Sequence, residues 1–197
     1  NSPLDGEVYN LGESITFTAT VTDQEDIPSD ISLSWVSDID GEFSTDSPDS
    51  NGNASFPNSS LSAGNHVISV LATDGAGLTA SASLTLRINT PPPAPTVSIT
   101  PDPAATNDDL SVVLIDGIDA DGDSLTYSYQ WFQNGNGTTY ASTSIPSSAT
   151  TYEETWKVRV TPNDGYTDGD HAEATVTIVN SQPTVTSVVI SPPTIYN

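Results

Sequence analysis

The sequence predicts an all-β fold of tandem two-sheet sandwiches, with about seven strands in each. Short runs in which apolar and polar residues alternate recur along the chain, as is typical of half-buried strands. Residues that favour turns, such as the Asp-Gly and Asn-Gly pairs, separate these runs. The same landmarks return after roughly 90 residues, which indicates a tandem repeat.

Each landmark of the repeat has a counterpart in the other half of the chain. DQEDIPSDISLSW and DADGDSLTYSYQW both run from an acidic cluster to a tryptophan, and VLATDG and ASLTLRI match VTPNDG and ATVTIVN. The matching segments are 23–35 with 119–131, 70–75 with 160–165, and 82–88 with 174–180.

The strands follow from the alternation, taken in order. In the first repeat we predict strands at 3–9, 14–22, 31–35, around Phe43 and Phe56, at 66–72 and at 79–88, the last two forming a hairpin. In the second repeat we predict strands at 97–99, 110–114, 125–131, 156–160 and 172–178. The residues expected to be buried at equivalent places are Trp35 and Trp131, Val70 and Val160, and Leu84 and Val176.

A proline-rich segment, NTPPPAP at 89–95, marks the boundary between the repeats. Proline favours extended backbone, so we expect a semi-rigid spacer. The predicted domains are a sandwich at 1–90 that lacks its first strand, a second sandwich at 91–182, and the opening strand of a third repeat at 183–197.

Composition excludes several classes of function. The chain has 3 Lys and Arg against 26 Asp and Glu, a formal charge of −23, which disfavours nucleic acid and anionic membrane surfaces and attracts cations. It has no cysteine, which excludes thiol chemistry. No apolar run approaches the ~20 residues that span a bilayer, so we expect no membrane insertion.

The densest carboxylate cluster is Asp119, Asp121 and Asp123, at alternate positions around Gly122. One bent loop can turn these side chains toward a single point, where their repulsion favours a hard cation such as Ca²⁺. The loop is not an EF-hand, because its twelfth position is Gln130 rather than glutamate. The alternative interpretation is a solvated acidic turn.

Sandwich topology adds further candidate ligands. The loop between the second and third strands lies at the same end as the loop between the sixth and seventh, so we expect the cluster to neighbour residues 163–170. The first repeat has its own acidic loop in the matching position. The predicted calcium ligands are Asp119, Asp121, Asp123, Asn163, Asp164, Asp168 and Asp170, with Asp23, Glu25 and Asp26 in the first repeat.

The motifs together resemble the immunoglobulin-like PKD and cadherin-like repeats of large bacterial or archaeal extracellular surface proteins. The resemblance rests on Trp35, Trp131, the ATDG and PNDG turns, and AGNHVISVLATDG at 63–75. DADGDSLTYS at 119–128 is similar to the DxD loop of cadherin-type repeats. The resemblance covers nearly the whole chain and implies calcium at domain junctions and a location at the cell surface.

Two functions fit these observations. The first is a non-enzymatic structural repeat of an extracellular fibre, stalk or adhesin. The second is a carbohydrate- or protein-binding accessory module of a secreted enzyme, with polysaccharide as one partner. We expect no catalytic residues, because His66 and His171 lack a nucleophile motif beside them. Glycosylation sequons, expected in loops, begin at Asn53, Asn58 and Asn136.

The C-terminal apolar strand at 183–190 repeats the opening of the second repeat, a strand that the first repeat lacks. Two explanations remain open. The chain is an excerpt of a longer array of neighbouring repeats, or this strand completes the first repeat of an identical subunit, head to tail, by β-strand addition. In either case we expect 183–190 to pair outside the two sandwiches of its own chain.

Overall fold

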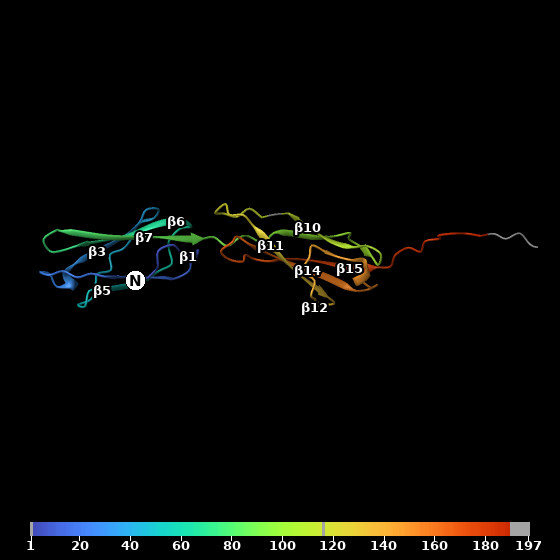
Figure 1. The fold of residues 1–197 in the computed structure, drawn as a ribbon, viewed down its shortest axis with the longest axis horizontal. Coiled ribbons are helices and arrows are strands. Elements are labelled where there is room, and N and C mark those ends of the chain that lie inside the picture. Colours follow the sequence, from blue (N-terminus) through green and yellow to red (C-terminus); the bar gives the residue numbers. More distant parts are fainter. Residues whose placement is uncertain (1, 116, 190–197) are drawn as a thin grey trace, which may run out of the picture. The chain divides into compact units, whose positions relative to one another are not determined.

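The computed structural model describes residues 2–115 and 117–189 (Figure 1). Regular structure in these residues is almost entirely β, as the sequence predicted. The chain divides into two compact units. Unit 1 comprises Asn1–Ala94 with Asp116–Tyr127 and Thr161–Asp170, and unit 2 comprises Pro95–Ile115, Ser128–Val160 and His171–Asn197. These units follow spatial proximity rather than the repeat period, so the domain boundaries at 90 and 182 remain a prediction.

Unit 1 contains a five-stranded sheet in the order β1-β7-β6-β3-β4 and a two-stranded sheet of β2 and β5. A 3-10 helix, η1 (Pro28–Asp30), precedes β3. The strand bounds are β1 (Glu7–Asn10), β2 (Ile15–Thr20), β3 (Ser32–Ser37), β4 (Gly41–Ser44), β5 (Asn53–Asn58), β6 (Gly64–Thr73) and β7 (Thr79–Asn89).

The core of unit 1 is aromatic and lies between these two sheets. β2 alternates as predicted and buries Ile15 and Phe17. The Phe17 ring stacks on Phe56 of β5 with centroids 5.7 Å apart, and Trp35 meets Phe56 edge-on at 5.2 Å. Such aromatic pairs add about 0.5–1.5 kcal/mol beyond the burial of their area. The packing confirms Trp35 as a core residue.

The β6–β7 hairpin is paired along its whole length, from Gly64↔Ile88 to Thr73↔Thr79. In its turn, the Asp74 carboxylate accepts the main-chain N–H groups of Ala76 and Leu78, both at 2.8 Å. On its other side β7 pairs with β1 in parallel, but only from Leu86 to Asn89. The first half of β7 therefore has an open edge within the part of unit 1 that the structure describes.

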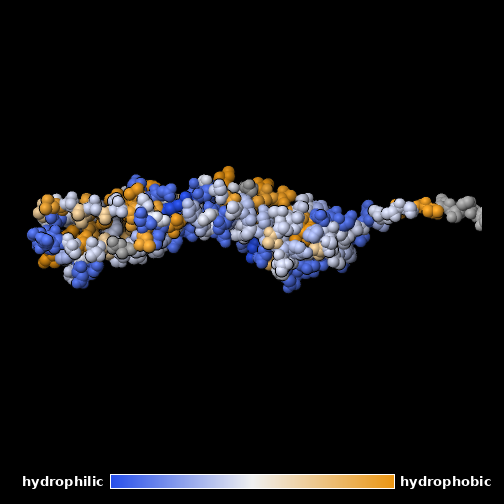
Figure 2. Space-filling view, in the orientation of Figure 1, coloured by the Kyte–Doolittle hydropathy of each residue, from blue (hydrophilic) through white to orange (hydrophobic). Residues whose placement is uncertain are grey.

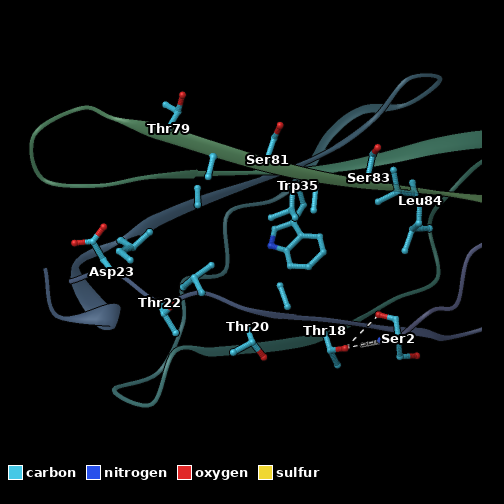
Figure 3. Close-up of a pocket in the computed structure, with 18 of the residues that line it drawn as sticks. Ser2, Thr18, Thr20, Thr22, Asp23, Trp35, Thr79, Ser81, Ser83 and Leu84 are labelled. Atoms are coloured by element: carbon cyan, nitrogen blue, oxygen red, sulfur yellow. Dashed lines mark hydrogen bonds between the residues drawn. The ribbon is translucent and has the colours of Figure 1, made fainter. Parts of the chain in front are cut away.

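A groove of about 720 Å³ follows this open edge and the facing end of β2. We call it the strand groove. It is lined by residues 2–5 and 18–23, by Ile31, Trp35, Ile68, Val70, Ala72 and Asp74, and by residues 78–84. The prediction that Val70 and Leu84 are buried holds only in part: both pack against the core but are half-buried, because they face this groove (Figure 3).

Unit 2 is built on the sheets β13-β10-β8 and β12-β11-β14-β15-β9. The bounds are β8 (Thr96–Thr100), β9 (Ala104–Ala105), β10 (Leu110–Ile115), β11 (Thr126–Gln133), β12 (Asn136–Gly137), β13 (Ser144–Ile145), β14 (Thr155–Asn163) and β15 (Ala172–Val179), with η2 (Ser147–Ala149). Trp131 and Trp156 meet edge-on in its core, with centroids 6.3 Å apart. The predicted burial of Trp131, Val160 and Val176 is confirmed.

Two smaller predictions need correction. Two sequon asparagines, Asn53 and Asn58, are the first and last residues of β5, and Asn136 lies in β12, so none is in a loop. The proline-rich spacer starts later than predicted, because Asn89 belongs to β7 and is fully buried. Composition alone places such polar residues in loops, but in the structure strand pairing holds them in sheets.

The predicted C-terminal strand forms no strand over 183–189, and Ile190 lies outside the described residues. Its valines are among the most exposed apolar residues of the chain: Val185 is 81%, Val188 74% and Val189 85% exposed. Figure 2 shows hydrophobic residues in this segment, next to the grey ones. Pairing of 183–190 with another chain stays a prediction.

Within the described residues, no helix is long and apolar enough to cross a membrane.

Candidate cation site

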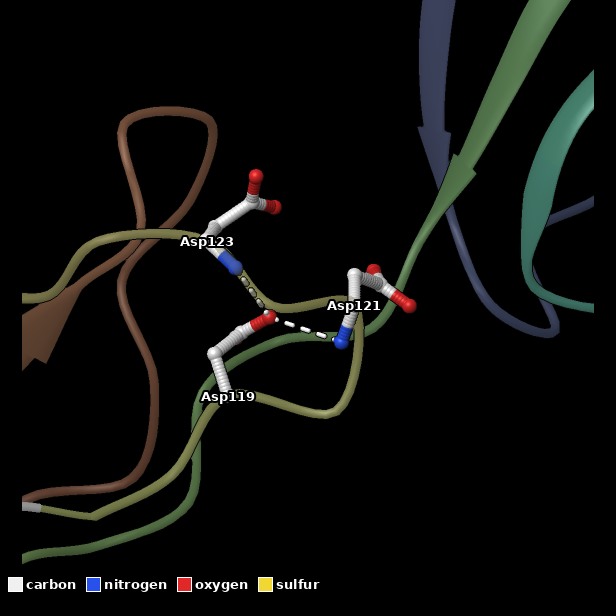
Figure 4. A group of neighbouring side chains, drawn as sticks. All are labelled: Asp119, Asp121 and Asp123. Carbon is white, nitrogen blue, oxygen red and sulfur yellow. Dashed lines mark hydrogen bonds between the residues drawn. The ribbon is translucent and has the colours of Figure 1, made fainter.

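The acidic loop at 117–125 folds around the Asp119 carboxylate. One oxygen, Oδ1, accepts the main-chain N–H of Asp121 at 2.8 Å and that of Asp123 at 3.3 Å (Figure 4). Gly122 takes a φ of +82°, in the left-handed region that side chains rarely adopt, so glycine permits the bend. As a result, the three carboxylates each offer an oxygen within 4.8 Å of the others.

The end of β7 meets this loop within unit 1. The main-chain N–H of Thr90 donates to Asp121 Oδ2 at 2.6 Å, and its hydroxyl donates to Oδ1 at 3.2 Å. Arg87 Nη2 donates to Asp123 Oδ2 and lies 3.7 Å from Asp121 Oδ2. Arg87 also stacks over the ring of Tyr166, 4.5 Å from its centroid. A protein cation therefore already compensates part of the charge of the three carboxylates.

The sequence pattern did not identify Arg87 as part of this site. The chain has only 3 basic residues, and this one lies just before the proline-rich spacer. In so acidic a chain, an isolated arginine at a predicted junction is a signal that it pairs with carboxylates there.

Asp164 is the only residue of the 163–170 loop that is buried, at 4% exposure. Its Oδ1 accepts the main-chain N–H groups of Tyr166 and Thr167, and its Oδ2 accepts the Asn89 side-chain amide at 2.8 Å. Burial alone would raise the pKa of Asp164, but these hydrogen bonds, first that of Asn89, lower it below its usual value. The hydrogen bond between Asp164 and Asn89 thus connects the 163–170 loop to the end of β7.

Two buried oxygens of this region lack a partner among the described residues: Asp119 Oδ2 and Asn89 Oδ1. A buried acceptor without a partner costs about 1–3 kcal/mol, so each of these oxygens calls for a partner such as an ordered water or an ion. Both are hard oxygen donors, and Ca²⁺ prefers carboxylate and amide oxygens. The residues present therefore fit a hard divalent cation, held by Asp119, Asp121 and Asp123.

Of the other predicted ligands of the second repeat, Asn163, Asp164 and Asp168 are engaged in other hydrogen bonds. Asn163 donates through its side-chain amide to Asp168 Oδ1 at 2.8 Å and accepts the main-chain N–H of Gly165. Asp170 is exposed. Among the described residues, only Asp119, Asp121 and Asp123 form a group of three carboxylates that could share an ion.

The acidic loop of the first repeat does not form such a group among the residues described. Asp23 Oδ1 accepts the main-chain N–H groups of Asp26 and Glu25, which lower the pKa of Asp23 in that order. Asp26 accepts the N–H of Gly75 at 3.2 Å. When Asp23 is aligned with Asp119, Asp26 stands in the place of Gly122 and Ile27 in that of Asp123. The first loop thus lacks the glycine, and its third acidic residue, Asp26, comes one position earlier than Asp123 does in the second loop.

Acid is expected to destabilise unit 1 through Asp164. Because the folded pKa of Asp164 is lowered, its contribution to stability is present above the ordinary value of 3.8 and is lost as the pH falls below it. We expect Asp164→Asn to be less stable than the wild type at neutral pH and to lose less stability on acidification. Urea unfolding at neutral pH and at about pH 3 measures this, with exposed Asp30→Asn as control. Equal acid sensitivity of Asp164→Asn and the wild type would contradict the assignment.

No family model matches this chain. No curated protein matches it. Among solved structures, titin domains A168-A170 superpose with a TM-score of 0.53 at 10% identity, over 86% of this chain and 60% of the titin chain. This chain thus spans less than two thirds of that titin fragment. The likeness shows an immunoglobulin-like β-sandwich fold and nothing of function.

Two further solved structures are similar at lower TM-scores. The fibronectin(III)-like modules of CbhA from Clostridium thermocellum match at 0.40 and 14% identity, over 91% of this chain and 93% of theirs. A Ca²⁺-stabilized adhesin of an ice-binding Antarctic bacterium matches at 0.47 and 21% identity, over 89% of this chain and 46% of its own. At such TM-scores neither supports a conclusion about this chain.

Proposed function

We propose that these immunoglobulin-like sandwiches, of the PKD or cadherin-like kind, form a non-enzymatic structural repeat of an extracellular fibre, stalk or adhesin. We further propose that Ca²⁺ bound by Asp119, Asp121 and Asp123 stiffens the array. The observation that carries the proposal is this carboxylate group, with its oxygens within 4.8 Å and a buried, unpartnered Asp119 Oδ2.

Calcium would act on a loop that is covalently continuous with β10 and β11. The loop contacts the end of β7 through Thr90 and Arg87. Neutralising the carboxylates removes their repulsion and fixes the loop conformation. Extracellular calcium modules bind with dissociation constants of about 10⁻⁴–10⁻³ M, which suits an extracellular location.

The histidines support a structural role. His66 is buried in unit 1, with Nδ1 2.7 Å from the Ser37 hydroxyl and Nε2 2.8 Å from the Ser62 carbonyl oxygen. Both ring nitrogens are thus engaged in holding local structure. His171 is exposed and lies just before β15.

The alternative is a carbohydrate- or protein-binding accessory module of a secreted enzyme. Its natural signature would be exposed aromatic rings on one sheet face. The exposed tyrosines include Tyr140 and Tyr166, but Tyr140 packs on Trp156 at 6.1 Å and Tyr166 lies under Arg87. Both rings therefore already have intramolecular partners, which favours the structural role.

Calcium is expected to raise the melting temperature and chelation to lower it, because the ion relieves repulsion among the carboxylates. Asp121→Asn should weaken both responses. Glu25→Gln, the matched position in the first repeat, should leave them unchanged. Differential scanning calorimetry with Ca²⁺ or EDTA measures the shift, and titration calorimetry measures binding. The absence of binding heat at millimolar calcium would remove the proposed site.

Stiffening needs a separate measurement. Small-angle scattering of the chain with and without Ca²⁺ should show a narrower distribution of maximum dimensions when the ion is bound. Asp121→Asn should show the broad distribution in both conditions. Binding without any change in the distribution would leave calcium as a local stabiliser and contradict the stiffening role.

A further inference from the structure

The buried histidine of unit 1 connects two segments that are far apart in the sequence. His66 lies in β6, and its ring lies between the end of β3 and the segment that precedes β6. Its Nδ1 atom contacts the Ser37 hydroxyl, and its Nε2 atom contacts the Ser62 carbonyl oxygen. The Asp40 carboxylate lies next to both and accepts hydrogen bonds from Ser62. We call these four residues the histidine latch.

The hydrogen bonds of the latch determine where the His66 ring carries its proton. The main-chain N–H groups of Ile39 and Asp40 both donate to Ser37 Oγ, each at 3.1 Å. A serine hydroxyl has two lone pairs, so Ser37 can only donate to Nδ1, which therefore carries no proton. A carbonyl oxygen can only accept, so Nε2 carries the proton and donates to Ser62. The closed latch thus requires a neutral His66 ring.

A second proton on His66 would break this arrangement. It would enter at Nδ1, where the new N–H would meet the O–H of Ser37. Ser37 could accept it only by releasing the main-chain N–H groups of residues 39 and 40, which hold the turn between β3 and β4. Because the His66 side chain is 0% exposed, water cannot supply another acceptor. Protonation therefore opposes the folded conformation of this turn.

The turn between β3 and β4 carries two carboxylates, and both are already engaged. Asp40 Oδ2 lies 3.8 Å from His66 Nδ1, too far for a hydrogen bond. Asp40 instead accepts the main-chain N–H of Ser62 at 2.9 Å and its hydroxyl at 2.6 Å. Asp38 Oδ1 accepts the main-chain N–H of Val67 at 2.7 Å. Asp40 can therefore pair with a charged His66 only by giving up Ser62.

The other charged group near this part of β6 is turned away from the ring. On β7, the residue opposite His66 is Leu86, which is apolar. The next residue, Arg87, donates to Asp123 of the acidic loop. Burial raises the pKa of Asp40, but the hydrogen bonds from Ser62 and then the nearby His66 bring it below the usual value of 3.8. Asp40 therefore stays ionised in mild acid, where histidine titrates.

We propose that the histidine latch is a pH-sensitive switch of unit 1, in which proton uptake by His66 releases the turn between β3 and β4 from the segment that precedes β6. The latch is closed at neutral pH and opens in mildly acidic surroundings, because histidine in water takes up its proton at about pH 6.5. This inference goes beyond the proposed function. It does not depend on calcium, because the latch residues come from β3, β6 and the segments beside them rather than from the acidic loop.

The sign of the expected pH dependence follows from the neutral ring. As the pH falls, the unfolded chain takes up a proton at His66 and the closed latch does not, so the unfolded state is favoured. Between about pH 7.5 and about pH 5.5, one such group lowers the ratio of folded to unfolded unit 1 about tenfold. Asp164 contributes only below its ordinary value of 3.8, so the two effects occur in separate pH ranges.

NMR of the whole chain in EDTA, with nitrogen-15 labelling, tests the latch directly. At neutral pH the His66 ring should carry its proton on Nε2. On acidification the amide signal of Ile39, which donates to Ser37, should shift in mild acid. The amide signal of Ala76, which donates to Asp74 in a turn without histidine, should not. A proton on Nδ1 at neutral pH, or an Ile39 signal that stays as constant as that of Ala76, would overturn the proposal.

Urea unfolding, followed through the amide signals of unit 1, measures the loss of stability. The wild type should show the tenfold fall between the two pH values, and His66→Asn, which cannot titrate, should show none. His171→Asn removes the exposed histidine and should keep the fall. The chain has 2 histidines, so a fall that persists in His171→Asn identifies His66 even if His66→Asn does not fold. A wild type without the fall, or a fall that disappears in His171→Asn, would contradict the latch.

Discussion

Trp131→Ala is expected to lower the unfolding free energy of unit 2 by about 3–5 kcal/mol. Trp131 is fully buried, meets the Trp156 ring edge-on at 6.3 Å, and donates its indole N–H to Ser142 O. Truncation would leave a large cavity and an unpaired carbonyl oxygen. Domain stabilities are commonly 5–15 kcal/mol, so the variant would be close to unfolding.

Chemical denaturation, followed by circular dichroism, measures this loss. Phe132→Ala is the matched control, because Phe132 is the next residue of β11 and its ring lies under Lys157 and Arg159 rather than in the core. We expect the control to lose clearly less stability. If both variants lose the same amount, Trp131 does not dominate the core of unit 2.

Arg87→Ala is expected to destabilise unit 1 in the absence of calcium and to increase its calcium affinity. Removing the guanidinium leaves the charges of Asp121 and Asp123 uncompensated. We expect this to lower the unfolding free energy by about 1–3 kcal/mol, which is less than the loss for a fully buried ion pair. The side chain of Arg87 is 17% exposed, which places it between buried and surface pairs. Because Arg87 and Ca²⁺ compensate the same carboxylates, added calcium should restore most of the lost stability.

Denaturation with and without calcium, together with titration calorimetry, tests this competition. Arg159→Ala is the control, because Arg159 pairs with Glu173 instead, with its side chain 38% exposed. The control should lose little stability and show unchanged calcium binding. A loss in Arg87→Ala that calcium does not reduce would show that the arginine and the ion do not share a site.

Local sequence pattern predicted most of the strands, although the strand expected at 3–9 begins only at Glu7. Ile15 and Phe17 alternate with threonines, and β2 buries these two residues, because side-chain direction in a strand follows from the backbone alone. Trp35 and Trp131 are buried for the same reason. Val70 and Leu84 have the same inward pattern but stay half-buried, since they face the strand groove, which local pattern does not reveal.

The candidate site was predictable only in part. Asp119, Asp121 and Asp123 lie in one loop, so their spacing alone indicated the cluster. The end of β7 contributes Arg87, Asn89 and Thr90, which lie about thirty residues earlier in the chain. The sequence does not show that these residues contact the loop; only the folded structure does. The acidic loop of the first repeat was expected to match, but there Asp26 takes the position of the glycine and Ile27 that of Asp123.

Unit 1 is not continuous along the chain, and this affects how the protein can fold during synthesis. Its last two segments, Asp116–Tyr127 and Thr161–Asp170, come after β7 and are interleaved with segments of unit 2. Domains commonly fold from the N-terminus as the ribosome delivers them. The hydrophobic core of unit 1 draws only on residues up to Ile88, so this core can form first, whereas the two later segments can join it only after the ribosome has delivered them. A nascent chain paused just after β7 would hold Asn89 and Arg87 in water, without the carboxylates that they later meet.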